Sequence, residues 1–193
     1  MSRISTQNRK TKETEISLSL DLDSGKPAKI NTPIPFFTHM LELFSKHGGF
    51  DIQCDVKGDV NVDFHHTVED TGIVLGNAFR EALGIKQGIR RYGCFLLPMD
   101  ETLVEVALDI SGRPYFSCDL KNAKGRAGDF DLDYCKHFFR SFAFQAQITL
   151  HIELRHGEDI HHISEAVFKG VAKALEQAVT IVGNEIPSTK GVL

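Results

Sequence analysis

Histidine is the most unusual chemical feature of this sequence, with nine residues in a chain of 193. Six of the nine follow a repeated pattern. Residues 65–69 read HHTVE, and residues 161–165 read HHISE, 96 positions further on. A lone histidine precedes each copy by a similar distance, His39 before the first and His137 before the second. Imidazole and carboxylate groups without thiolates favour Mn, Fe, Co, Ni or Zn, so the pattern indicates a divalent-metal protein.

The spacing inside each copy indicates how the ligands divide between ions. On a helix, positions i and i+4 share a face, so the first histidine and the glutamate of one copy can hold the same ion. The second histidine points about 100° away and is expected to reach a different ion. We therefore predict two sites, one formed by His39, His65, Glu69 and His162 and one formed by His66, His137, His161 and Glu165.

A single copy of this motif has a simpler interpretation as a helix start whose glutamate interacts with the N-terminal amides. Two copies at matched positions, each with a preceding histidine, favour the metal interpretation. Three histidines, His47, His151 and His156, lie outside the pattern.

The repeat extends beyond the histidines and predicts the fold. Glu13-Thr14 and Glu101-Thr102 each open a strand of alternating apolar and polar residues that ends in a Ser-Gly-basic-Pro turn. The expected strands cover residues 13–22, 50–56, 60–62, 94–97, 101–110, 115–120 and 147–154. The expected helices cover residues 36–48, 67–83, 133–144 and 164–182. We predict an α+β fold of two duplicated halves, 1–95 and 96–193, in one compact domain, each half a mostly antiparallel or mixed sheet with two helices packed against it.

Composition excludes several classes of protein. The formal net charge of −4 provides no basic excess for nucleic-acid binding. No apolar run approaches the roughly 18 residues of a membrane span, and the N-terminal residues are polar. The cysteines, at positions 54, 94, 118 and 135, form no CxxC pair and are typical of a reduced, cytoplasmic protein.

Basic and hydroxyl side chains near glycines are candidates for binding an anion such as a phosphate. Lys169 lies one helical turn beyond Glu165, on the face expected to hold a metal, although the same spacing also suits a simple ion pair. The other candidates are Arg90, Arg91, Arg113, Ser188 and Lys190.

Taken together, these motifs resemble those of the imidazoleglycerol-phosphate dehydratase family, in its monofunctional form. The resemblance runs from about Arg9 to Gly191 and has one visible departure, Thr38, where the family often has Asp. The matching segments are RKTKET (9–14), FFTHML (36–41), DFHHTVED (63–70), RYG (91–93), PMDE (98–101), SGRP (111–114), HHISEA (161–166) and PSTKG (187–191).

The resemblance implies a fold like that of ribosomal protein S5 domain 2. It also implies two Mn²⁺ per subunit on the ligands given above, and a homo-oligomer of about 24 subunits with active sites at the interfaces. The implied reaction belongs to histidine biosynthesis: a hydro-lyase dehydrates D-erythro-1-(imidazol-4-yl)glycerol 3-phosphate to 3-(imidazol-4-yl)-2-oxopropyl phosphate through a metal-stabilised imidazolate. Glu13 is the candidate base. The implied substrate-binding residues are Glu13, His39, His47, His65, Glu69, Arg91, Arg113, His161, Lys169, Ser188 and Lys190.

Two other functions fit the same ligands. A dinuclear metallohydrolase would need a bridging carboxylate between ions about 3.5–4 Å apart, and Asp63 and Asp70 lie close enough in sequence to leave this open. A non-enzymatic metal-binding shell protein would explain the histidines but not the basic positions or the PSTKG segment.

Overall fold

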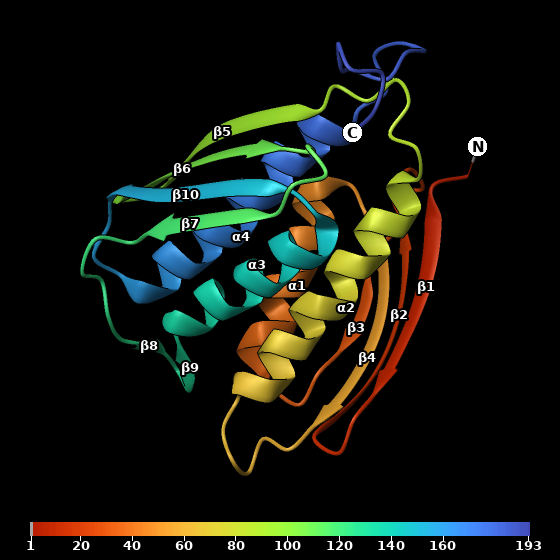
Figure 1. Ribbon diagram of the computed structural model, residues 1–193. Helices are drawn as coiled ribbons and strands as arrows, with labels where there is room; N and C mark the ends of the chain where they lie inside the picture. The colour runs from red at the N-terminus through yellow and green to blue at the C-terminus, as the bar shows by residue number, and fades with distance from the viewer. Residues whose placement is uncertain (1) are drawn as a thin grey trace.

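Two four-stranded sheets with the same topology form the outer layers of the molecule (Figure 1). The structure is a computed structural model that describes residues 2–193. The strand order is β1-β2-β4-β3 in the first sheet and β5-β6-β10-β7 in the second, and in each only the last pair is parallel. The strands are β1 (Ile4–Lys10), β2 (Thr14–Asp21), β3 (Lys29–Asn31), β4 (Asp51–Gly58), β5 (Tyr92–Met99), β6 (Thr102–Asp109), β7 (Tyr115–Asp119) and β10 (Thr149–His156), with a separate small pair, β8 (Arg126–Ala127) and β9 (Phe130–Asp131).

Four helices lie between the two sheets (Figure 1). They are α1 (Pro35–Gly48), α2 (His65–Leu83), α3 (Asp133–Ala146) and α4 (Ile160–Val179). Helix α2 packs on β1 and β2, and α4 packs on β5 and β6. Across the middle, α1 packs on α4 and α2 packs on α3. Each helix of the first half therefore contacts a helix of the second half, which brings side chains of the two halves together.

Phenylalanine fills the layer between the sheets. Phe37, Phe138 and Phe168 come from three different helices, are fully buried, and pack with ring centroids 5.3–6.5 Å apart. Aromatic pairs at such separations contribute beyond the area that they bury. Buried phenylalanines thus form part of the contact between the two halves of this tryptophan-free sequence.

Two glycines allow α2 and α3 to approach closely. A Cβ atom at Gly72 would lie 2.5 Å from the carbonyl oxygen of Phe138, and one at Gly76 would lie 2.6 Å from that of Phe142. Both contacts are with backbone, which cannot turn aside as a side chain can. Any larger residue here would push the two helices apart.

The α+β fold predicted from the sequence is confirmed, with differences in detail. Strand β1 was not predicted, because its inward side chains are polar: Ser5 and Gln7 donate hydrogen bonds to Glu81 of α2 and do not pack as apolar residues. Residues 60–62, predicted as a strand, form a turn, and the short strands β8 and β9 were not predicted. Helix α4 begins at Ile160, before its predicted start, because Asp159 caps it. The predicted boundary between residues 95 and 96 falls inside β5, whose pairing with β6 already begins at Tyr92.

No helix among residues 2–193 has the length and apolar character that crossing a bilayer requires.

We predict that Gly72→Ala destabilises the protein. Alanine favours a helix over glycine by about 1 kcal/mol, but the clash with the Phe138 carbonyl is expected to cost more, since overpacking typically costs about 1–3 kcal/mol. Gly183→Ala is the control, because a Cβ there meets nothing within 4 Å. Denaturant unfolding of both variants checks this, and a Gly72→Ala variant more stable than the wild type would contradict it.

Candidate metal centre

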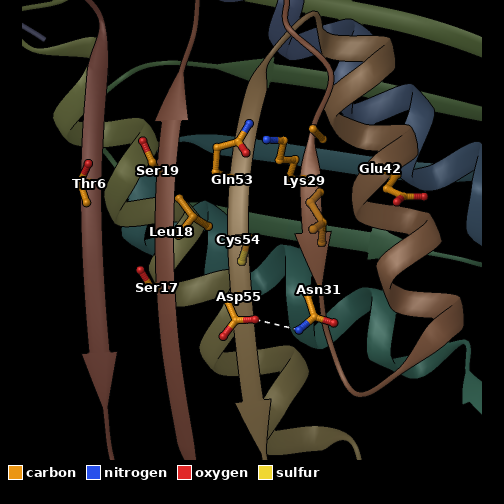
Figure 2. Close-up of a pocket in the computed structure, with 12 residues that line it drawn as sticks. Thr6, Ser17, Leu18, Ser19, Lys29, Asn31, Glu42, Gln53, Cys54 and Asp55 are labelled. Carbon is orange, nitrogen blue, oxygen red and sulfur yellow. Dashed lines mark hydrogen bonds between the residues drawn. The ribbon is translucent and has the colours of Figure 1, made fainter.

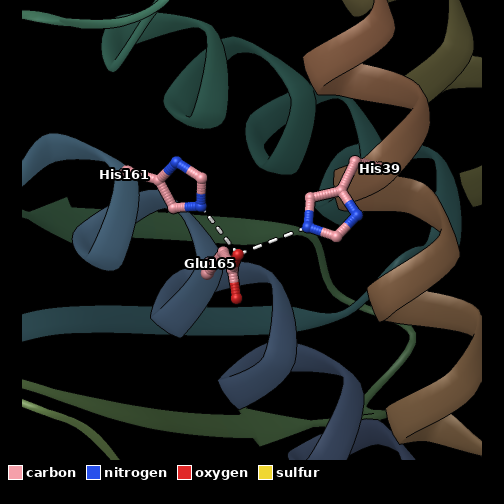
Figure 3. A group of neighbouring side chains, drawn as sticks. All are labelled: His39, His161 and Glu165. Atoms are coloured by element: carbon pink, nitrogen blue, oxygen red, sulfur yellow. Dashed lines mark hydrogen bonds and ion pairs between the residues drawn. The ribbon is translucent and has the colours of Figure 1, made fainter.

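Three potential metal ligands converge where α1 meets α4 (Figure 3). His39 comes from α1, and His161 and Glu165 come from the first turns of α4. Their ligand atoms all lie within 4.8 Å of one another. Nε2 of His161 is 2.8 Å from Oε1 of Glu165, and Nε2 of His39 is 3.3 Å from the same oxygen. Two imidazoles and a carboxylate facing one point are a donor set that fits a divalent metal ion.

Glu165 is the anionic centre of this triad. Burial alone would raise the pKa of its carboxyl group, but hydrogen bonds from Lys169 and His161, together with the charge of Lys169, hold the pKa to about 2. Because the residue is only 7% exposed, this negative charge lies largely out of water. A carboxylate that stays ionised at neutral pH is ready to bind a cation.

A second group with the same composition lies where α2 meets α3. Nε2 of His65 is 3.0 Å from Oε2 of Glu69, one helical turn away. The ring of His137, on α3, packs edge-on against that of His65 with a centroid distance of 4.5 Å. The hydroxyl group of Ser141 donates to the other oxygen of Glu69 at 3.3 Å. Each half of the chain thus contributes to each of the two groups.

The grouping predicted from helical spacing stays a prediction, and within one chain the nearest side chains are grouped differently. That prediction combined His39 with His65, Glu69 and His162, and combined His137 with His66, His161 and Glu165. Within the chain the lone histidines are exchanged, so His39 lies with His161 and Glu165, and His137 lies with His65. The physical reason is that α1 packs on α4 and α3 packs on α2, so that each lone histidine faces the helix of the opposite half.

The second histidine of each motif lies outside these two groups. Nδ1 of His66 is 3.0 Å from Asp59, and Nδ1 of His162 is 2.7 Å from Glu101. The hydrogen bond to the carboxylate raises the pKa of each histidine. In a single chain these two imidazoles are therefore engaged by acidic residues, and both remain partly exposed.

Asp70 is held away from the metal groups by the first sheet. Its side chain accepts hydrogen bonds from Thr14 and pairs with Nη2 of Arg9 at 2.9 Å. Asp63 accepts from the backbone N–H of His65 at 2.8 Å, which fixes the start of α2. Both aspartates are thus used in holding the fold. Neither is placed as the bridging carboxylate that a dinuclear hydrolase needs.

Glu13 lies in the turn between β1 and β2, with its side chain 52% exposed. Its Oε1 is 3.8 Å from Nε2 of His66. The backbone there is fixed, because Thr11 accepts from the N–H groups of Glu13 and Thr14. In the motif RKTKET, Arg9 and Thr14 therefore connect β1 and β2 to Asp70 of α2. The carboxylate of Glu13 faces solvent beside His66.

The candidate anion ligands divide between two places. Lys169 pairs with Glu165 and lies beside the first triad, and its Nζ is 3.8 Å from Sδ of Met99. His47, one helix over, has a pKa lowered by burial and by the charges of Lys169 and Lys173. Lys169 thus places a positive charge next to the triad, with a mainly neutral imidazole, His47, nearby.

The remaining candidates gather at one end of the second sheet. Arg91 donates to both carboxylate oxygens of Asp109, at 2.7 and 3.1 Å, and to the carbonyl of Pro187 at 2.9 Å. That last contact holds the C-terminal segment, where the N–H of Lys190 donates to Ser188 at 3.2 Å. The guanidinium of Arg113 lies 3.4 Å from the carbonyl of Ser111 in the loop after β6. A cavity lined by Arg91, Tyr92, Pro187, Ser188 and Thr189, among others, opens beside them.

A further hollow on the outer face of the first sheet lies away from this chemistry (Figure 2). Asn31 and Asp55 are hydrogen-bonded across it at 2.7 Å. Ser17, Ser19 and Thr6 also line it. None of the residues predicted to bind metal or substrate belongs to its lining, so we do not place the site there.

Three acidic residues outside the predicted site each bind a side chain that was predicted to belong to it. They are Asp59, which contacts His66, Glu101, which contacts His162, and Asp109, which contacts Arg91. Sequence spacing offered a signal only for Glu101, which follows Asp100 in PMDE and occupies the repeat position of Glu13. Asp59 and Asp109 have no local signal, because they meet His66 and Arg91 only through the folding of the chain.

The fold and these groups define a class of protein: a duplicated α+β chain with two histidine–carboxylate groups, each built from both halves. Comparison with known proteins then specifies the family. The family model described as imidazoleglycerol-phosphate dehydratase matches residues 32–175.

Individual relatives agree with this match over nearly the full chain. The imidazoleglycerol-phosphate dehydratase of Caldicellulosiruptor saccharolyticus is 50% identical over 191 residues, covering 99% of this chain and 98% of the relative. That of Azorhizobium caulinodans is 52% identical over 188 residues, covering 96% and 95%. The crystal structure of the Staphylococcus aureus enzyme superposes with a TM-score of 0.84 at 39% identity, covering 92% of this chain and 99% of that one. The chain belongs to the imidazoleglycerol-phosphate dehydratase family, as its sequence motifs predicted.

We predict that Asp70→Asn lowers stability without removing metal. The substitution removes the charge of the buried Asp70 that pairs with the partly exposed Arg9, so we expect a loss of about 1–3 kcal/mol in the free energy of unfolding. Manganese content per chain should stay at the wild-type value, whereas a bridging ligand would lose metal. Asp129→Asn, in the exposed β8–β9 turn, is the control for loss of one negative charge. Loss of metal with unchanged stability would contradict the structural role.

Proposed function

We propose that this chain dehydrates D-erythro-1-(imidazol-4-yl)glycerol 3-phosphate to 3-(imidazol-4-yl)-2-oxopropyl phosphate, as a hydro-lyase of histidine biosynthesis. The observation that carries the proposal is the triad of His39, His161 and Glu165, assembled from family motifs that lie far apart in the sequence. An imidazole-bearing substrate suits a metal centre whose own ligands are imidazoles and carboxylates.

The proposed cofactor is two Mn²⁺ ions per chain, one in each group. Residues His39, His161 and Glu165 would hold one ion, and His65, Glu69 and His137 the other. When bound, the metal supplies Lewis-acid chemistry that stabilises negative charge on a coordinated nitrogen at neutral pH. Three protein ligands per ion leave positions for a ligand from another copy and for substrate.

The proposed assembly is a homo-oligomer of about 24 subunits with active sites at the interfaces. Its support is that His66 and His162 lie outside both groups of their own chain, although both belong to the HHxxE motifs. In this proposal a neighbouring copy receives them as the fourth ligands of its own ions. We also propose a cytoplasmic location, for which the four free cysteines are the support.

Glu13 is proposed as the base that moves the proton. The reaction removes hydroxide from the carbon attached to the ring and a proton from the next carbon, giving an enol that becomes the ketone. A carboxylate is a suitable acceptor for that proton. Its exposed position beside His66 puts Glu13 next to any site that His66 completes in a neighbouring copy.

The phosphate is proposed to lie against the cationic groups described above. Arg91 and Ser188 line one cavity and offer guanidinium and hydroxyl donors, and Lys190 follows in the same C-terminal segment. Arg113, in the loop after β6, offers a second guanidinium. Lys169 offers positive charge beside the first triad, and His47 offers an imidazole N–H that can donate a hydrogen bond. Holding the phosphate would fix the carbon chain so that the reacting carbons meet the base.

The central test is metal-dependent dehydration. The protein is stripped of metal with a chelator, titrated with Mn²⁺, and assayed for formation of the keto phosphate from the imidazole glycerol phosphate. We expect no turnover without metal and full turnover at two ions per chain. Release of inorganic phosphate from the same substrate would favour a hydrolase, and metal binding without any conversion would favour a shell protein.

We predict that Glu13→Gln abolishes most turnover while retaining metal. Loss of a general base typically costs about 10²–10⁴-fold in rate, and the amide keeps the size of the side chain. Glu15→Gln is the matched control, since Glu15 is an exposed glutamate two residues away whose partner is Lys10. Steady-state kinetics, metal content and particle size are measured together. Near-normal turnover in Glu13→Gln would remove this residue from the mechanism.

A further inference from the structure

Two imidazoles that belong to no metal group of their own chain are each held by a carboxylate in the same way. Nδ1 of His66 lies 3.0 and 3.2 Å from the two oxygens of Asp59. Nδ1 of His162 lies 2.7 Å from Oε2 of Glu101. Neither acid belongs to an HHxxE motif, and the two come from different places in the repeat. The same contact has thus been built twice with different residues.

The chemistry of this contact determines which ring nitrogen is free. An ionised carboxylate can only accept a hydrogen bond, so Nδ1 must carry the hydrogen. In the neutral imidazole the lone pair is then on Nε2, the nitrogen directed away from the acid. Carboxylates that bind a ligand histidine in this way fix both its tautomer and its ring orientation, and increase its basicity toward the metal.

Glu101 is itself rigidly held. Its Oε1 accepts hydrogen bonds from the hydroxyl of Thr102 at 2.8 Å and from the backbone N–H of Asp159 at 3.1 Å. Asp159 in turn caps α4 by accepting from the N–H of His161 and of His162. The carboxylate therefore joins the β5–β6 turn to the first turn of α4, and its other oxygen sets the ring of His162.

The two halves differ in which acid does this. Glu101 occupies the repeat position of Glu13, since Glu13-Thr14 and Glu101-Thr102 lead into β2 and β6. In the first half, however, Glu13 is 3.8 Å from Nε2 of His66 and makes no contact with Nδ1, which Asp59 occupies. Asp59 lies in the segment from Gly58 to His65, which is three residues longer than the segment from Gly157 to His161.

We propose that Asp59 and Glu101 are positioning residues that hold His66 and His162 with Nε2 free to complete the metal sites of a neighbouring copy. The proposal rests on the metal sites of the proposed function. It adds that Glu13 and Glu101, which occupy equivalent positions in the two halves, have different roles. Because Asp59 orients His66, the glutamate at the repeat position, Glu13, is left free for proton transfer. In the second half Glu101 has the orienting role and is not a base.

The test compares Asp59→Ala, Glu101→Ala and Glu101→Gln in the full-length protein. Manganese affinity and stoichiometry are measured by calorimetry. The alanine variants are expected to bind the affected ion about 10–100-fold more weakly. Glu101→Gln should recover part of this loss, because the amide oxygen can still accept from Nδ1. Glu158→Gln, an exposed acid in the loop before α4, is the control for charge and should bind as the wild type does.

A second readout is independent of metal and of activity. In metal-free protein labelled with ¹⁵N-histidine, NMR of the ring nitrogens should show His66 and His162 with hydrogen on Nδ1. The alanine variants should shift the affected ring toward hydrogen on Nε2. Asp59→Ala matters most here, because Asp59 has no side-chain partner other than His66 among the described residues, so that loss of fold is not expected.

The outcomes separate the two proposals. If the wild type binds no manganese, the metal sites of the proposed function fail, while the NMR tautomers still test the orienting contacts. If the wild type binds two ions and the alanine variants bind them equally well with unchanged tautomers, the positioning role is overturned. At saturating Mn²⁺, Glu101→Gln should turn over substrate whereas Glu13→Gln should not, which is the expected division between the two glutamates.

Discussion

The packing of helices from one half against helices of the other is the constraint on which the site depends. Helices α2 and α3 approach so closely that Gly72 and Gly76 face backbone carbonyls, and α1 and α4 pack beside them. Each His–Glu pair lies one turn apart on its own helix, but the third ligand comes from the partner helix. The geometry of each candidate metal group is therefore set by the distance between helices and not by local spacing alone.

The two glutamates at equivalent positions of the HHxxE motifs, Glu69 and Glu165, have different neighbours in this packing. Glu165 is paired with Lys169, while Glu69 receives a hydroxyl from Ser141. The first site is bordered by positive charge and the second by a neutral donor. Ions of the same kind in these two groups would meet different electrostatic environments, which suits a substrate with an imidazole at one end and a phosphate at the other.

What could be predicted from the sequence was determined by local patterns. Alternation identified β2 and β6, and the i,i+4 rule placed His65 with Glu69 and His161 with Glu165 on helical faces. The partner of His39 could not be read in this way, because it depends on α1 packing on α4. Strand β1 could not be predicted from alternating hydrophobicity, because its inward residues Ser5 and Gln7 form hydrogen bonds with Glu81 and are not apolar. Such features depend on contacts between segments distant in the chain.

The exchange of His39 and His137 between the halves also bears on how such a chain could have arisen. A single half contains a His–Glu pair but lacks the third ligand, which always comes from the other half. An ancestor of half this length could have completed a triad only as a dimer, with two identical centres. Within a single chain the two groups are not required to be identical, and here Lys169 pairs with Glu165 whereas Ser141 donates to Glu69.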